Sequence, residues 1–527
     1  MSLTSCIDTL VLSYLYNPGL ENGHGLEAWG KRLKYPKGDF NDFSRLTPEM
    51  VTYCRNDVEL TFKVYNALTE KMRRLGFSEL SADIEHKIRV ILDEQQRNGI
   101  WFARERASSF RDFLRLRQTD LAKQIRTLFP DDARQVAEYP FRRTKDGSPF
   151  KSYGTHVQKY DRVEHFKRDG KEFYRCFQTQ EFNLNSPKQR VDRLLALGWK
   201  PEKFTEKGFP KVDEDALMVF AEESGKPEIA ALAEYLVIQG RASMLDTWFN
   251  NLGEDSRIHG RVLTCGATTR RMIHFLPNTA NIPSGAKAKY GKEVRSFWGV
   301  EPDKGLVLVG YDASGLETAG LCHYLNNPEA THVLLRDKPN DIHTSNARRL
   351  SEALNRPVDR EWGAKTTWYA WLYGAGVKKL GSILKGSPSD GEVVVETFFR
   401  NVPGLKELIN DVQGEWNTSS GLIRCIDSGY VRCPSRSAAL NYLIQSMGAI
   451  LMKMTSIILD EDAKKLGLPF LKVLDVHDEG QLQVEEKYAK DLGELAVRSI
   501  EKAARELKLN VPVTGSYSIG PDWSFTH

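Results

Sequence analysis

Two acidic segments of the chain contain residue types that could hold a divalent metal ion. In the first, an apolar run at 306–311 leads directly into Asp312, and a tight turn segment separates Asp312 from Glu317. In the second, Asp478 and Glu479 are adjacent in a polar turn between two apolar arms. A strand that ends in a carboxylate holds it rigidly, and adjacent carboxylates repel each other unless a cation is present. Taken alone, each segment is more often structural, because an Asp at a strand end commonly caps a helix and acidic residues are common in hairpin turns.

A third segment has the residue types that suit a nucleotide. Lys365, Tyr369 and Tyr373 are spaced i, i+4 and i+8, so they share one face of a helix that Asp359 would cap. A cation followed by two aromatic rings can hold phosphates, a base and a sugar. The alternative is an aromatic core helix whose lysine extends to solvent.

The elements that must position these residues are predicted from hydrophobic periodicity and turn residues. We expect a mixed α/β chain. The segment 131–180 holds 11 Lys/Arg, 8 Asp/Glu and nine aromatic residues with two Asp-Gly turn signals, which predicts a basic, hairpin-rich insert. The other expected elements are a strand at 8–13, helices at 50–68, 80–98 and on to 128, helices at 186–251, strands at 256–312, helices at 325–420, a hairpin at 470–484 and a helix at 487–507.

The composition excludes several classes of protein. Hydrophobic residues make up 41% of the 527 residues, yet no apolar run approaches the roughly 20 residues that a spanning helix needs, so we expect no membrane association. The seven cysteines contain no C-x-x-C pair, which is typical of reduced thiols and predicts a cytoplasmic protein. The net charge of +4 does not by itself indicate nucleic-acid binding.

Seven motifs occur in the order that they have in family A (DNA polymerase I-like) DNA polymerases. The Asp312 segment resembles the first catalytic motif of that family, the Lys365 helix resembles its nucleotide-binding finger helix, and the Asp478 turn is similar to its second metal motif. The other matching segments are Thr269-Arg-Arg271 with 277–283, Asp341-Ile-His343, Asn441-x3-Gln445 and 520–527. The resemblance covers essentially the whole chain and is closest to the replicative polymerases of short-tailed bacteriophages.

This resemblance implies a fold and an activity. The fold is the right hand of palm, fingers and thumb, with a truncated RNase H-like 3′–5′ exonuclease lobe. The activity is template-directed, DNA-dependent DNA synthesis in replication, with dNTPs added to a primer 3′ end. The implied location is the cytoplasm, which is that of the bacterial host if the chain is phage-encoded. The implied divisions are a partial exonuclease domain at 1–75, a thumb at 76–255 with its insert at 131–180, a first palm part at 256–324, fingers at 325–436 and a second palm part at 437–527.

The resemblance also implies residue roles around two Mg²⁺ ions, with Mn²⁺ as the substitute. Asp312 and Asp478 would bridge the two ions, with the carbonyl of Ala313 as a further ligand and Glu479 supporting the site. Two ions of this kind activate the attacking hydroxyl and neutralise the leaving charge in phosphoryl transfer.

The implied nucleotide and DNA contacts come from six motifs. Lys365 and His343 would hold the triphosphate, with Arg360 as a weaker candidate. Tyr369 would pack on the incoming sugar and base and favour dideoxynucleotides, and Glu317 with Tyr373 would exclude ribonucleotides. The primer–template contacts would come from Arg271, Asn441, Gln445 and His477.

The chain departs from the family pattern in both halves of the site. Ala319 stands where the family has an arginine, which removes an expected buried cation, and Arg270 stands where the family has glycine, which is expected to add charge near the primer strand. In the finger helix, Glu361 occupies the usual arginine position and Arg360 precedes it. Five residues of α-helix place Arg360 about 140° off the Lys365 face.

The first 75 residues resemble the end of a proofreading domain. Tyr53-x3-Asp57 looks like its last motif and the segment around Asp8 resembles an earlier one, whereas the Asp-x-Glu strand is missing. A two-metal exonuclease without half of its carboxylates cannot hold its metals. We therefore expect no proofreading by this chain, and the first 75 residues are either a truncated remnant or the interface for a separate exonuclease polypeptide.

The basic insert and the overall class leave alternatives. The insert at 131–180 would recruit a processivity factor, contact duplex phosphates directly or be a solvated loop. A single-subunit RNA polymerase shares the palm aspartates, but Glu317 and the exonuclease remnant argue against it. A DNA-binding scaffold with an inactive palm is disfavoured by Asp312, Asp478 and Lys365.

Overall fold

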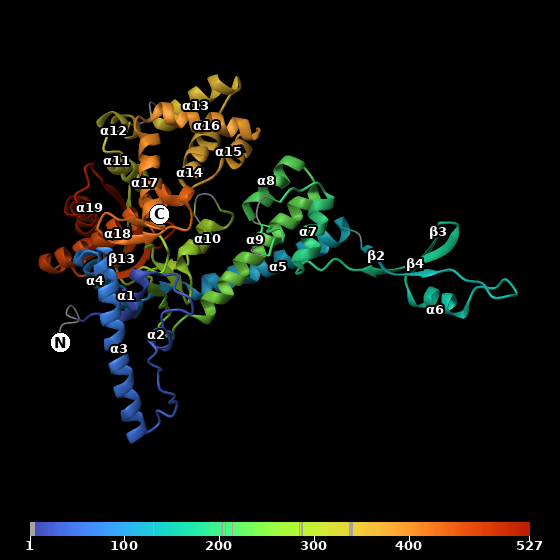
Figure 1. Cartoon of the computed structure of the whole chain (residues 1–527), viewed down its shortest axis with the longest axis horizontal. Helices are drawn as coiled ribbons and strands as arrows, with labels where there is room; N and C mark the ends of the chain where they lie inside the picture. The colour runs from blue at the N-terminus through green and yellow to red at the C-terminus, as the bar shows by residue number, and fades with distance from the viewer. Residues whose placement is uncertain are drawn as a thin grey trace. The chain divides into compact units, whose positions relative to one another are not determined.

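The computed structural model describes residues 6–129, 131–201, 204–205, 207–212, 214–283, 285, 288–336 and 341–527. The chain forms two compact units (Figure 1): unit 1 combines Met1–Ala103 with Asn251–His527, and unit 2 is Arg104–Asn250. The segment at 76–103, which the sequence places in the thumb, groups with unit 1. The domain divisions implied by the family resemblance stay predictions.

The centre of unit 1 is a four-stranded antiparallel sheet in the order β12-β13-β9-β14. Its strands are β9 (Leu306–Ala313), β12 (Leu471–Val476), β13 (Glu479–Glu485) and β14 (Gly515–Gly520). Helix α19 (Ala489–Glu506) packs on β9 and β14, and α4 (Glu79–Asn98) packs on β12. The predicted strand before Asp312 and the predicted hairpin around Asp478 are therefore both confirmed, as paired strands of one sheet.

The long helix α18 (Ala439–Leu466) packs against both α4 and α19. The expectation that no apolar run approaches the length of a membrane span is wrong by length and composition. A window within Arg436–Leu466 has the length and hydropathy of a span, but 83% of that window is buried inside the protein. This burial is that of a core helix, and it accounts for the apolar sequence without a membrane.

A helical group follows β9 in the chain. It begins with helix α11 (Leu316–Leu325). The first turns of α12, α13 and α16 are capped by the side chains of Asn327, Asp341 and Ser387. Trp368 is fully buried against Phe398, at 5.0 Å between ring centroids. The bounds are α12 (Pro328–Leu334), α13 (Ile342–Leu354), a π-helical turn (Arg360–Lys365), α14 (Thr366–Leu372), α15 (Val377–Ile383), α16 (Pro388–Asn401), α17 (Leu405–Thr418), β10 (Leu422–Arg424) and β11 (Tyr430–Arg432).

Smaller elements complete the palm side of unit 1. The strands β5, β1 and β8 form a three-stranded sheet, and β6 pairs with β7. Their bounds are β1 (Ile100–Phe102), β5 (Arg257–Ile258), β6 (Arg261–Leu263), β7 (Ile273–Phe275), α10 (Gly291–Arg295) and β8 (Trp298–Gly299).

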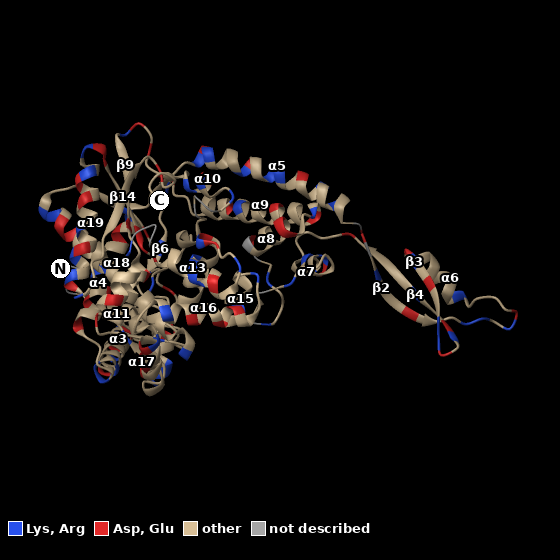
Figure 2. Cartoon of the chain, turned by 90° about the horizontal axis from the view of Figure 1, so that it is seen from above, with Lys and Arg blue, Asp and Glu red and all other residues tan. Residues whose placement is uncertain are grey.

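Unit 2 is a helical body with a sheet insert. Helices α5 (Arg104–Leu128) and α9 (Pro227–Asn250) are joined by ion pairs from Arg115 to Asp246 and from Arg117 to Glu234. Figure 2 shows basic and acidic residues interspersed along α5. The predicted hairpin is confirmed, since β3 and β4 turn at two positive-φ residues, Asp169 and Gly170. The remaining bounds are β2 (Asp132–Pro140), α6 (Lys151–Lys159), β3 (Arg162–Arg168), β4 (Lys171–Gln180), α7 (Pro187–Ala196) and α8 (Glu214–Ser224).

In the described part of the first 75 residues, the regular elements are all helices, joined by non-helical stretches at 17–25 and 33–47. The predicted strand at 8–13 is wrong, because these residues begin α1 (Thr9–Tyr16), whose first turn is capped by the Asp8 carboxylate accepting from Leu10 N–H. Helix α1 packs on α3 (Pro48–Leu75), and α2 (Leu26–Arg32) packs there too. A cap and a helical partner override the strand-like composition of this run.

Close packing around β9 can be tested at Gly310, two residues before Asp312. A Cβ at Gly310 would lie 2.4 Å from the carbonyl oxygen of Thr526 and 2.6 Å from the side-chain nitrogen of Gln481. We expect Gly310→Ala to lower the free energy of unfolding by about 1–3 kcal/mol, as overpacking does, measured by denaturant unfolding. The control is Gly414→Ala in α17, where a Cβ meets nothing within 4 Å and the better helix former should cost nothing. Equal stability of the two variants would contradict this packing.

Candidate active site

Asp312 and Asp478 are brought together by strand pairing. Asp312 lies opposite Glu479 in the β9–β13 register, and the backbone N–H of Ala313 donates to the carbonyl of Asp478 at 3.1 Å. His477 has φ of 57°, so the turn between β12 and β13 bends sharply enough to set Asp478 beside the end of β9. The two segments that the sequence singled out therefore form one acidic site.

The acidic site concentrates negative charge in a half-buried place. Burial and the neighbouring Asp478 and Glu479 carboxylates raise the pKa of Asp312 to about 7. Burial also raises the pKa of Asp478, with the Glu317 carboxylate adding to the effect. Both shifts mean that the ionised carboxylates are disfavoured unless positive charge is supplied.

Glu479 differs from Asp312 and Asp478 because residues near the C-terminus bind its carboxylate. Its carboxylate accepts from Trp523 Nε1 and from the Gln481 amide at 2.6 Å, and it lies 2.5 Å from His527 Nδ1. Glu479 and Trp523 are 4% and 0% exposed. This carboxylate is held as part of the packing, which fits the supporting role that the sequence predicted for it.

The Lys365 helix meets the acidic site through Glu317. The hydroxyl of Tyr373 donates to Glu317 at 2.9 Å, and the rings of Tyr369 and His343 lie 5.7 Å apart. Burial raises the pKa values of both tyrosine hydroxyls, and Glu317 adds to each shift. The nucleotide-binding residues predicted from three motifs, Glu317, His343 and the two tyrosines, are thus linked by a continuous series of contacts.

A π-helical turn changes the position expected for Arg360. The N–H of Ala364 donates to the carbonyl of Asp359 at 2.9 Å, an i→i+5 bond that widens the turn. Residues five apart stand above one another in such a turn, so Arg360 comes toward the Lys365 side and the 140° offset does not apply. The sequence reasoning assumed an α-helix and missed this; the Arg-x4-Lys spacing, one residue longer than the family's, was the available signal.

Both finger cations are paired with carboxylates in this structure. Arg360 contacts Asp341, the cap of α13, and also Glu361, and Lys365 donates to Glu361 at 3.2 Å. Arg360 lowers the pKa of Asp341, which burial opposes. Asp341 and Glu361 are contact residues to which the sequence reasoning assigned no such role.

A small cavity collects most of the predicted DNA contacts. Its lining includes Arg271, Glu317, Gln445, His477 and Asp478. Arg271 Nη2 lies 4.0 Å from Glu317, and the Gln445 amide donates to Asn441 at 2.7 Å. Four segments far apart in sequence therefore meet at the metal-motif turn.

The exonuclease-like residues do not gather in this way. Asp8 caps α1, whereas Tyr53 and Asp57 lie one turn apart on α3 beside Lys37, which is 3.9 Å from Asp57. Across the described ranges, no three His, Cys, Asp or Glu side chains form a ready-made metal cluster, either here or at Asp312.

The two departures in the palm have structural explanations. The expectation that Arg270 adds charge near the primer strand is wrong: Arg270 is 3% exposed and its guanidinium donates to Asp427 and Glu85. Ala319 is 3% exposed and belongs to the apolar core, so no buried cation is missing around it.

An antiparallel sheet that sets two carboxylates together, beside a helix that presents a cation and aromatic rings, defines the palm and fingers of a nucleic-acid polymerase. A family model described as DNA polymerase family A matches residues 157–525. The chain belongs to this family and is a DNA-directed DNA polymerase. Polymerases of the family are metal-dependent enzymes.

The similar proteins are phage and bacterial DNA polymerases. The DNA-directed DNA polymerases of Escherichia phage T7 and Enterobacteria phage T3 are each 28% identical, over 99% of this chain and 88% of theirs. DNA polymerase I of Helicobacter pylori is 26% identical over 74% of this chain and 44% of its own length. The polymerase domain of Pol1 from M. smegmatis has the same fold, with a TM-score of 0.75 at 22% identity over 98% of this chain and 82% of that one. The predicted family and the mixed α/β polymerase fold are confirmed.

The His527–Glu479 pair predicts a pH-dependent stability. Its bond to Glu479 raises the pKa of His527 above the ordinary 6.5, so the pair's contribution is complete below about pH 6.5 and is lost as the pH rises through the raised pKa. His527→Gln should therefore destabilise the chain more at pH 6 than at pH 9. The loss should not exceed about 1 kcal/mol, because solvent screens a side chain that is 37% exposed. A difference that grows toward pH 9 would contradict the pairing.

Proposed function

We propose that this polymerase extends a DNA primer in replication by phosphoryl transfer at two Mg²⁺ ions, with Asp312 and Asp478 as the metal ligands. The single observation that carries the proposal is the meeting of these two carboxylates, with raised pKa values, at the end of the β9–β13 pairing. The M. smegmatis structure is a complex with DNA primer-template and dNTP, which supports binding of DNA and a dNTP by this chain as well.

The donor set fits magnesium. Mg²⁺ is usually bound by one or two carboxylates together with substrate phosphates and water, and not by an all-protein cage. Two carboxylates without a third acidic ligand agree with that pattern, and Ala313 adjoins them through its N–H, which donates to the carbonyl of Asp478. When bound, the ions polarise the primer hydroxyl and neutralise the pyrophosphate that leaves.

The remaining roles belong to the chain's own side chains. Lys365, His343 and Arg360 would bind the triphosphate oxygens as charged donors. Tyr369 would stack on the base, and the Tyr373–Glu317 bond would hold a carboxylate where a 2′-hydroxyl would otherwise fit. The primer–template contacts are assigned to Arg271, Asn441, Gln445 and His477.

The first 75 residues are proposed as the interface for a separate exonuclease polypeptide, and this chain as a polymerase without proofreading. Helix α3 buries Leu60, Val64 and Leu68 on one face. On the opposite face Val58 and Phe62 are 70% and 64% exposed. A second apolar face supports a protein partner more than a solvated remnant.

The insert at 131–180 is proposed to contact duplex phosphates, with a processivity factor as the other occupant. Part of its basic charge is already paired within the sheet, because Arg168 and Arg175 both contact Glu138. Arg162 and Lys167 are also paired, with Glu164 and Glu172, so the proposed DNA contact rests on the cations outside all four pairs.

The metal-ligand assignment predicts the effect of Asp478→Asn. Extension of a recessed primer with Mg²⁺ should fall by at least about 10³-fold, since several kcal/mol of transition-state stabilisation is lost. Binding of primer–template should persist. Asp303→Asn, at an exposed turn outside the site, is the matched control and should extend normally.

A mismatched primer in the same assay tests proofreading. We expect no shortening by the wild-type chain, with or without dNTPs. Shortening by this chain alone would contradict the reading of residues 1–75, and full extension by Asp478→Asn would contradict the ligand assignment.

The Glu361 carboxylate is expected to compete with the triphosphate for Lys365 and Arg360. Glu361→Gln should lower KM for dNTP by up to about fivefold with little change in kcat, because exposed pairs are worth at most about 1 kcal/mol. Glu396→Gln, which breaks the similar exposed pair to Arg400 in α16, is the control and should leave KM unchanged. A higher KM in Glu361→Gln would show that Glu361 assists nucleotide binding.

A further inference from the structure

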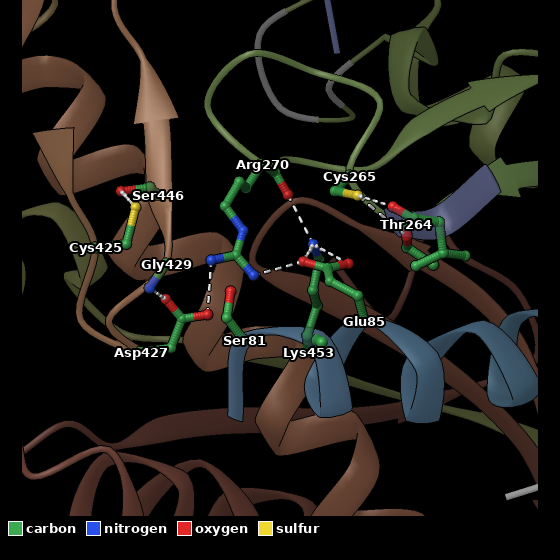
Figure 3. Close-up of polar contacts among 12 residues, drawn as sticks. Ser81, Glu85, Thr264, Cys265, Arg270, Cys425, Asp427, Gly429, Ser446 and Lys453 are labelled. Carbon is green, nitrogen blue, oxygen red and sulfur yellow. Dashed lines mark hydrogen bonds and ion pairs between the residues drawn. The ribbon is translucent and has the colours of Figure 1, made fainter. Parts of the chain in front are cut away.

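A buried cluster of four charged residues lies behind Arg271 and takes no part in the chemistry above. Figure 3 shows Glu85, Arg270, Asp427 and Lys453 pointing toward one another. Their exposed fractions are 0%, 3%, 2% and 1%. They come from α4, from the segment after β6, from the β10–β11 turn and from α18, so the cluster joins four elements far apart in sequence.

The cluster is balanced in charge and closely bonded. Arg270 donates to Glu85 at 2.8 Å and to Asp427 at 2.6 Å. Lys453 donates to both oxygens of Glu85, at 2.7 and 2.9 Å. Two cations and two carboxylates compensate one another, which a group this deeply buried requires.

The cluster holds the main chain as well as the side chains. Lys453 Nζ donates to the carbonyl of Arg270 at 2.8 Å, and the Arg270 N–H donates to the carbonyl of Ala267 at 2.9 Å. Arg270 has φ of 62°, the left-handed region that favours glycine. A non-glycine residue stays there only when its surroundings impose the conformation. The bonded carbonyl belongs to the peptide that leads into Arg271.

Arg271 is the residue that benefits from this fixed peptide. Its guanidinium lies 4.0 Å from Glu317 and it lines the same cavity as His477 and Asp478. A long arginine side chain reaches a given point only if its own backbone is set, and misplacement by about 1 Å can cost a hundredfold in rate.

We propose that Arg270 is a positioning residue for DNA synthesis, which acts by fixing the backbone of Arg271 against the primer terminus. Glu85, Asp427 and Lys453 are the buried partners through which it does so. The proposal rests on the proposed contact of Arg271 with the primer–template. A purely structural role would instead affect the whole fold and would not depend on Arg271.

The test is a double-mutant cycle in the full chain. Asp427→Asn keeps a side-chain oxygen that can accept from the Gly429 N–H, as Asp427 Oδ1 does at 2.9 Å, but removes the charge that Arg270 binds. Arg270→Lys keeps the charge but replaces the planar fork with a point charge that cannot serve both carboxylates. Each is made with Arg271 intact and with Arg271→Ala.

The readouts are the Kd for primer–template and the single-turnover extension rate at saturating dNTP, with thermal unfolding measured in parallel. With Arg271 intact, we expect each cluster variant to weaken binding or slow extension by about tenfold or more. With Arg271→Ala, the same variants should change these values by less than about twofold, while the unfolding midpoint falls equally in both backgrounds.

Three outcomes would overturn the proposal. The first is an equal loss of binding and rate in both backgrounds, which marks a structural cluster only. The second is no loss with Arg271 intact. The third is an Arg271→Ala chain that binds and extends the primer as well as the wild type does, because Arg270 would then have no contact to position. The polymerase activity itself is tested separately at Asp478 and would not be affected by this outcome.

Discussion

The mutual repulsion of the carboxylates at the end of the β9–β13 pairing is the constraint on which the rest of the site depends. Antiparallel pairing fixes Asp312 opposite Glu479 and next to the Asp478 turn, so three carboxylates occupy a half-buried place. Trp523 and His527 bind the Glu479 carboxylate, and the Tyr373 hydroxyl donates to the Glu317 carboxylate. Asp312 and Asp478 keep the raised pKa values. The acidic residues are thereby divided into two that need a cation and two that protein groups already satisfy.

The parts of this site that could be predicted from sequence are those encoded locally. The strand before Asp312, the turn at Asp478 and the helical face of Lys365 and Tyr369 each follow from residue spacing within about a dozen positions. Their convergence was predictable only through the resemblance, because no periodicity says which strand pairs with which.

The parts that sequence reasoning missed depend on contacts or hydrogen bonds that spacing does not reveal. The strand expected at 8–13 is a helix because Asp8 caps it and α3 packs on it. The turn before Lys365 is π-helical, and a rule built on 3.6 residues per turn misplaces Arg360. Arg270 was expected to add charge near the primer strand, but it is buried against partners on three distant segments.

The two departures from the family pattern, at Ala319 and Arg270, both concern where a buried positive charge is placed. An arginine is absent at Ala319, which lies in an apolar core on α11, a helix that packs on α18. An arginine is present at Arg270, where the partner carboxylates are neutralised jointly with Lys453 of α18. Neither change leaves a buried charge unpaired, and an unpaired buried charge is the usual reason why such a change damages a fold. The proposed acidic pair of Asp312 and Asp478, with the proposed finger lysine Lys365, argues against an inactive scaffold.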